Sequence, residues 1–175
     1  MSTSDMPALP DVRRVVTGHN DAGIAVVRIQ DTVAPKESPA FPGISGHQLW
    51  LTDDVPTDDN NSEVDGITRT ADRDLGLVIN GGSNLRYTDL APGARAPMHR
   101  TSSLDYNVLV QGKIILEMED GSETLVENPG DVVIQRGTIH AWRNAGPGWT
   151  RFVTVIIDAK PAVVGDRILG VEVRS

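Results

Sequence analysis

The chain has 175 residues with 24 acidic and 16 basic side chains, so its formal net charge is −8 at pH 7, and it contains no cysteine. This balance disfavours a nucleic-acid partner, although a pocket inside an acidic protein can still be basic. The lack of cysteine excludes disulfides, thiolate catalysis and Cys-ligated metals. No apolar run approaches the roughly 20 residues that cross a bilayer, and the N-terminus lacks signal-peptide features. We therefore expect one cytoplasmic domain that binds a small molecule and contacts neither nucleic acid nor membrane.

The first part of the chain contains few strand patterns. Residues 1–22 begin with a polar, Pro-containing stretch and are expected to form an N-terminal arm. Residues 23–30 are a β-branched run and residues 47–52 alternate, so both predict strands. Between them, residues 31–46 contain three prolines and predict an extended loop. Residues 53–65 are rich in Asp and Glu; we interpret them as a solvated acidic loop rather than a cation site, because they lack EF-hand spacing.

From residue 75 onward, short apolar runs alternate with glycine-containing turns, and Asp120-Gly121 is a strong two-residue hairpin signal. These runs predict strands at residues 75–80, 84–90, 97–101, 105–111, 113–119, 123–127, 131–135, 138–144 and 150–158. Many short strands with regular turns are typical of a β-sandwich or a closed barrel such as a jelly roll. The sequence therefore predicts an all-β fold.

Two sets of residues within this region keep a distinctive spacing. The first set is Gly93, His99, Thr101, Asp105 and Gly112. The second set is Gly130, Gly137, His140 and Asn144, with Gln135 two positions before the second glycine. Together they resemble the two sequence motifs of the cupin family, in which Gln135 would replace the usual proline. The phrases around His99 and His140 are similar to small single-domain cupins of fungal and bacterial secondary-metabolite clusters.

The resemblance implies a cupin jelly-roll barrel over residues 84–158, with the arm at 1–22, strands and loops of 23–83 packed on the barrel or on a partner subunit, and a C-terminal tail at 159–175. Family members typically bind one metal through three histidines and a glutamate. Here Thr101 stands at the position of one histidine and Asp105 at that of the glutamate. The resemblance therefore implies either no cofactor or one divalent metal (Fe, Zn, Mn or Ni) held by His99, Asp105 and His140.

Strand alternation indicates which of these side chains share a face. His99 and Thr101 lie two residues apart on one strand, as do His140 and Trp142 on another, so each pair points the same way. We expect His99, Asp105 and His140 to be catalytic and Thr101, Arg86 and Trp142 to contact substrate inside the barrel. Two alternatives stay open: Asp105 could cap the preceding turn, and Trp142 could be part of the wall.

Three functions are compatible with this set. The first is a lyase or isomerase, such as a dehydratase or decarboxylase, acting on a carbonyl or polyketide-like compound; histidine can remove a proton next to a carbonyl, and a poorly solvated aspartate can act as the acid. The second is a non-haem iron oxygenase with a two-histidine, one-carboxylate face. The third is a non-catalytic ligand-binding module. We also expect a homodimer, in which the N-terminal strands cover apolar edges.

Overall fold

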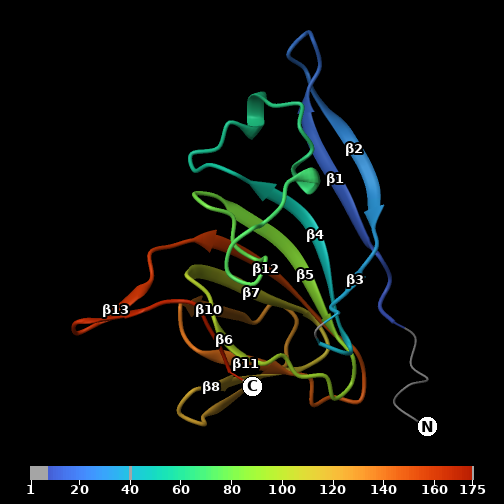
Figure 1. The fold of residues 1–175 in the computed structure, drawn as a ribbon. Coiled ribbons are helices and arrows are strands. Elements are labelled where there is room, and N and C mark those ends of the chain that lie inside the picture. Colours follow the sequence, from blue (N-terminus) through green and yellow to red (C-terminus); the bar gives the residue numbers. More distant parts are fainter. Residues whose placement is uncertain (1–7, 40, 175) are drawn as a thin grey trace.

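The computed structural model describes residues 8–39 and 41–174, which form two facing antiparallel sheets and almost no helix (Figure 1). The larger sheet has the strand order β10-β7-β12-β5-β4-β3 and the smaller sheet the order β15-β6-β11-β8-β9. The larger sheet consists of β3 (Lys36–Glu37), β4 (Ile44–Thr52), β5 (Ser83–Leu90), β7 (Ser103–Gln111), β10 (Val132–Arg136) and β12 (Thr150–Asp158). The smaller sheet consists of β6 (Met98–Arg100), β8 (Ile114–Met118), β9 (Glu123–Val126), β11 (His140–Arg143) and β15 (Glu172–Arg174). This arrangement confirms the all-β jelly roll.

A cluster of buried apolar side chains from both sheets lies between them. It consists of Leu90, Leu109, Ile114, Leu116, Val126, Trp142 and Phe152. These residues alternate with outward-facing neighbours along their strands, as expected for strands that are buried on one face. Burial of each large side chain contributes roughly 1.5–3 kcal/mol, so this cluster is a main source of the stability of the barrel.

The N-terminal hairpin was only partly predicted. β1 (Val12–His19) pairs with β2 (Ala25–Val33), and the two strands project beyond the sheets (Figure 1). Within the N-terminal arm expected at residues 1–22, the sequence did not indicate a strand from Val12 onward; residues 1–7 of the arm lie outside the described residues. Arg14, which is 7% exposed, fixes the hairpin through ion pairs of 2.6 Å with Asp31 and 2.7 Å with Asp65. Arg14 occupies an inward-facing position near the start of β1, where an apolar residue would have revealed the strand alternation in the sequence.

A buried polar network joins the hairpin to the outer face of the larger sheet. His47 is fully buried, and its Nδ1 lies 2.9 Å from the carbonyl oxygen of Val33 at the end of β2. Arg151 donates to both carboxylate oxygens of Asp89, at 2.6 and 2.5 Å, and to the carbonyl of Pro10 at 2.8 Å. The network thereby connects β4, β5 and β12 with the open end of the hairpin, where β1 begins and β2 ends.

Two further segments differ from the sequence prediction. Residues 74–77 form a turn in which Asp74, Leu75 and Gly76 all have positive φ, and Val78 makes only an isolated bridge with Arg73. The tail beyond residue 158 forms a second hairpin, β13 (Ala162–Val164) with β14 (Arg167–Leu169), and then β15, which pairs with β6. Two short 3-10 helices, η2 (Asp59–Asn61) and η3 (Gly66–Thr68), lie between β4 and β5. No helix in the described ranges is long and apolar enough to span a membrane.

Candidate active site

A cavity of about 370 Å³ lies between the two sheets. Its floor and walls come from the inward faces of β4, β5, β7 and β12 on one side and of β6 and β11 on the other. Leu75, Gly76 and Leu77, from the turn that the sequence did not predict, also line it, as do Lys36 and Phe41. The cavity is large enough for a small organic molecule.

The two motif histidines form a cross-strand pair on the smaller sheet. His99 on β6 is the direct partner of His140 on β11, and the ring centroids are 4.5 Å apart. The Nδ1 of His99 lies 2.8 Å from the carbonyl oxygen of Pro97, and that of His140 lies 3.0 Å from the carbonyl oxygen of Thr138. Because a carbonyl oxygen only accepts, each Nδ1 must carry the hydrogen, and each Nε2 retains a free lone pair.

Both rings are neutral at physiological pH. Burial lowers the pKa of His99, and burial together with the nearby His99 ring lowers the pKa of His140 to about 4. A charge on one ring would repel a charge on the other, so the pair can take up one proton but not two. The site therefore offers two unprotonated Nε2 atoms that can act as bases or accept hydrogen bonds.

Asp105 faces the same cavity from β7 of the larger sheet. It is 8% exposed, and its Oδ1 is buried without a hydrogen-bond partner in the described part of the chain. Burial raises the pKa of Asp105 to about 6, although a hydrogen bond from Ser103 acts in the opposite direction. At pH 7 about one Asp105 in ten therefore carries a proton that it can donate, and this fraction rises to about half at pH 6. The hydrogen bond from Ser103 agrees with the alternative in which Asp105 caps the preceding turn, whereas Oδ1 of Asp105 makes no such contact with any described residue.

Polar side chains form a row across the larger sheet beside Asp105. Gln48 on β4 pairs with Arg86 on β5, Arg86 with Thr154 on β12, and Thr154 with Asn107 on β7. All four residues line the cavity. Only Arg86 was expected from the sequence. Alternation from Asp105 along the predicted strand 105–111 would have identified Asn107, whereas Gln48 and Thr154 depend on strand register.

Of the other two residues expected to contact substrate, Trp142 lines the cavity and Thr101 does not. Trp142 lines the cavity as part of its wall: its ring lies 5.8 Å from that of His140 in an edge-on arrangement and 5.3 Å from that of Phe152. Thr101 is buried, but its hydroxyl lies 2.7 Å from that of Ser103, and the residue is absent from the cavity lining. The chain leaves the strand at residue 100, so the alternation that links Thr101 to His99 ends there.

The donor atoms do not fit the metal site that the family pattern implies. No three His, Asp or Glu side chains within residues 8–39 and 41–174 are arranged to hold a metal ion. His99 and His140 lie together on one sheet, Asp105 lies on the other, and Thr101 is turned to Ser103.

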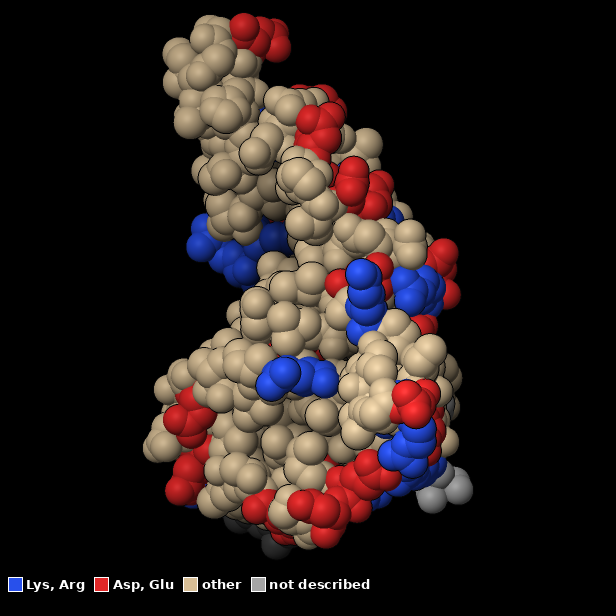
Figure 2. Space-filling model, turned by 90° about the vertical axis from the view of Figure 1, so that its left-hand side faces the viewer, with Lys and Arg blue, Asp and Glu red and all other residues tan. Residues whose placement is uncertain are grey.

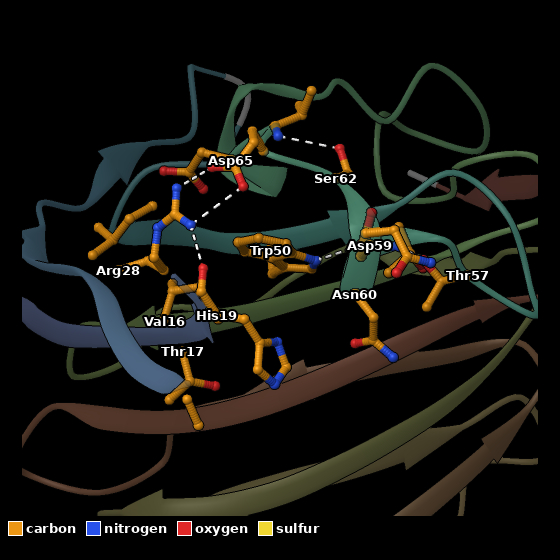
Figure 3. A pocket seen from close by; sticks show the side chains of 17 residues that line it. Val16, Thr17, His19, Arg28, Trp50, Thr57, Asp59, Asn60, Ser62 and Asp65 are labelled. Atoms are coloured by element: carbon orange, nitrogen blue, oxygen red, sulfur yellow. Dashed lines mark hydrogen bonds and ion pairs between the residues drawn. The ribbon is translucent and has the colours of Figure 1, made fainter. Parts of the chain in front are cut away.

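A second groove, of about 700 Å³, lies between the projecting hairpin and residues 57–65 (Figure 3). Its acidic residues are already paired: Asp59 accepts from Trp50 Nε1 at 2.8 Å, Asp65 binds Arg14, and Glu63 binds Arg28. These ion pairs leave no carboxylate cluster for a cation. The acidic segment thus fixes the base of the hairpin rather than forming a reactive site.

The two facing sheets around a cavity with paired motif histidines define a cupin-type barrel. Phomopsin biosynthesis cluster protein D of Diaporthe leptostromiformis is 35% identical over 172 residues, covering 95% of this chain and 88% of that protein. The cupin-domain-containing oxidoreductase virC of Hypocrea virens is 31% identical over 169 residues, covering 95% and 86%. The chain belongs to the cupin-domain proteins of secondary-metabolite clusters.

The fold has a solved counterpart. The polyketide cyclase RemF from Streptomyces resistomycificus matches 81% of this chain and 79% of its own, with a TM-score of 0.50. Because the two sequences are only 16% identical, this similarity concerns the fold alone. No family model matches the chain.

Proposed function

We propose that the protein is an enzyme of secondary metabolism that catalyses a lyase or isomerase reaction on a small carbonyl compound without a metal. The observation that carries this proposal is the arrangement of two neutral imidazoles, each with a free Nε2, across a cavity from an aspartate whose pKa is about 6. Bases and an acid that are poised in opposite protonation states near neutral pH are the requirement for general acid–base catalysis.

The histidine pair acts as the base. One Nε2 removes the proton from the carbon next to the substrate carbonyl, and the pair then holds this single proton. One ring of the pair takes the proton, and the other ring, which stays neutral, can accept a hydrogen bond from the substrate. Protonated Asp105 donates to the leaving hydroxyl or to the carbonyl oxygen. Dehydration, decarboxylation or cyclisation can follow from this step.

Deuterium exchange tests the first step without knowledge of the natural substrate. Small 1,3-diketones and β-hydroxy ketones are incubated with the protein in D₂O, and incorporation at the carbon next to the carbonyl is followed by NMR. We expect exchange with the wild type and a loss of at least a hundredfold in His99→Ala and His140→Ala, in line with the size of general-base effects. His19→Ala, outside the cavity, is the matched control. Full exchange in both cavity variants would refute the proposal.

A metal-dependent oxygenase is the second candidate, because relatives such as virC are named oxidoreductases. It requires O₂ uptake that depends on added Fe(II) and on His99 and His140. Oxygen consumption with the same carbonyl panel, measured with and without Fe(II), separates the two candidates. A non-catalytic binding protein would bind these compounds and return them unchanged and undeuterated.

A further inference from the structure

Arg86 lines the cavity and forms no ion pair with any other described residue. Its Nε is buried, and the guanidinium has no hydrogen bond or ion pair with any residue that the structure describes. The three buried arginines of the described ranges differ from it: Arg14 binds Asp31 and Asp65, Arg100 binds Glu172, and Arg151 binds Asp89. An isolated buried charge is costly, so an arginine without a partner on the inner face of β5 indicates that its partner is a ligand.

The backbone opposite Arg86 leaves room for the guanidinium. A Cβ atom at Gly46 on β4 would lie 2.4 Å from Nη2 of Arg86, so any other residue at position 46 would displace the guanidinium. Gly46 is not among the glycines with positive φ, so the backbone conformation does not require glycine there. Glycine at this position accommodates the arginine.

The charges around the cavity favour an anion. The charged or titratable residues of its lining are Lys36, Arg86, His99, Asp105 and His140. The two imidazoles are neutral, and Asp105 carries a full negative charge only well above pH 6. Lys36 pairs with Gly46 in the sheet register, so both cations lie at the same end of the polar row. The cavity is therefore cationic inside a protein whose net charge is −8.

We propose that Arg86 binds the carboxylate of the substrate, so that the enzyme acts on a small carbonyl compound that is also a carboxylic acid. The planar guanidinium matches the two oxygens of a carboxylate. Asn107 supplies a second donor, because its Oδ1 accepts from Thr154 at 2.7 Å while its Nδ2 lies at the long distance of 3.5 Å from the carbonyl of Val133. This inference rests on the proposed function for the reaction and adds the substrate class.

Binding of the substrate carboxylate by Arg86 also restricts which reactions the enzyme can catalyse. Decarboxylation moves the negative charge of a carboxylate onto carbon, and an arginine that stabilises this charge on the oxygens opposes that step. The carboxylate held by Arg86 is thus retained in the product. Dehydration, isomerisation or cyclisation at the carbon facing His99 and His140 remain as the reactions that fit.

The role of Arg86 in carboxylate binding is tested with pairs of small acids and their methyl esters. Calorimetry with benzoate and salicylate, each compared with its methyl ester, is performed on the wild type, Arg86→Met and the surface control Arg136→Gln. We expect the wild type and Arg136→Gln to prefer the acids, and Arg86→Met to lose roughly tenfold to a hundredfold in affinity for the acids but not for the esters, as for loss of a charged hydrogen bond. Equal affinity of the wild type for acid and ester, or unchanged acid binding by Arg86→Met, would overturn the proposal.

Thermal unfolding keeps the test interpretable if binding is weak. Removing an unpaired buried charge should raise the Tm of Arg86→Met above that of the wild type, whereas a structural role of Arg86 would lower it. Failure of the two proposals can be told apart. If the wild type catalyses deuterium exchange of neutral ketones but does not bind acids more tightly than esters, only the proposed role of Arg86 is refuted. Acid binding that depends on Arg86, with exchange that does not depend on the histidines, refutes only the proposed reaction.

Discussion

Replacement of Asp105 by asparagine removes a titrating group from the cavity and should increase stability at neutral and alkaline pH. The carboxyl has a pKa of about 6 in the folded chain, compared with an ordinary value of 3.8. An acid whose folded pKa is raised contributes stability that is complete below pH 3.8 and is lost as the pH rises through 6. A difference of about two pH units, at 1.36 kcal/mol each, makes ionised Asp105 destabilising by about 3 kcal/mol at pH 8.

The pH dependence of the effect distinguishes titration from packing. From the same two pKa values, the stability advantage of Asp105→Asn over the wild type should grow by about 1.4 kcal/mol between pH 5 and pH 8. Urea unfolding at both pH values measures this difference, and Asp21→Asn in the exposed hairpin turn controls for the change in net charge. The variant should also lose catalysis, because an amide cannot donate the proton. An advantage that is the same at both pH values would refute the assignment of Asp105 as the acid.

Three further predictions follow from other parts of the structure. Exchange activity should fall as the pH rises through about 6, because Asp105 then loses its proton; a pH–rate profile that stays level up to pH 8 would contradict this. His47→Ala should destabilise the fold by about 2–4 kcal/mol in urea, because it leaves a buried cavity and unpaired partners; an effect below about 1 kcal/mol would show that the network is dispensable. Light scattering should give twice the 18.8 kDa of one chain, and Ile134→Asp, on the half-exposed outer face of β10, should shift the protein to a monomer.

The tip of the projecting hairpin offers a second surface for that dimer. It is largely uncharged in the view of Figure 2, and the hairpin exposes Val15, Ile24 and Val27. Val132 and Ile134 on the larger sheet are exposed as well, so the dimer is expected to cover apolar residues on the hairpin or on β10. A monomer at micromolar concentration would contradict the expectation of a homodimer.

The parts of the fold that local patterns determine were predictable. From residue 84 to residue 158, apolar alternation and glycine turns place every strand within two residues of its observed end. The strand expected at 75–80 did not form because Leu75 and Gly76 have positive φ in a turn, a property that apolar content does not reveal. β1 and β15 were missed because β1 is held by the ion pairs of Arg14, and β15 is a three-residue edge strand stabilised by its pairing with β6.

In the candidate site too, the sequence indicated the features that depend on local spacing and not those that depend on long-range contacts. His99, Asp105, His140, Arg86 and Trp142 all line one cavity, because motif spacing and strand parity fix which faces they occupy. The hydrogen bond of Thr101 to Ser103 depends on where β6 ends, which the sequence does not indicate. Gln48 and Thr154 lie beside Arg86 because of the register between neighbouring strands of the larger sheet. Sequence spacing does not indicate this register.

The protonation state of the two cavity histidines is the most direct test of the account. Long-range ¹H–¹⁵N spectra of protein with ¹⁵N-labelled histidine report the tautomer and charge of each ring, before and after treatment with a chelator. We predict that His99 and His140 are both neutral at pH 7 with the hydrogen on Nδ1, that chelation changes neither ring, and that His140 titrates with a pKa of about 4. A ring that is charged at pH 7, or Nε2 resonances that shift when a metal is removed, would contradict metal-free acid–base catalysis by this pair.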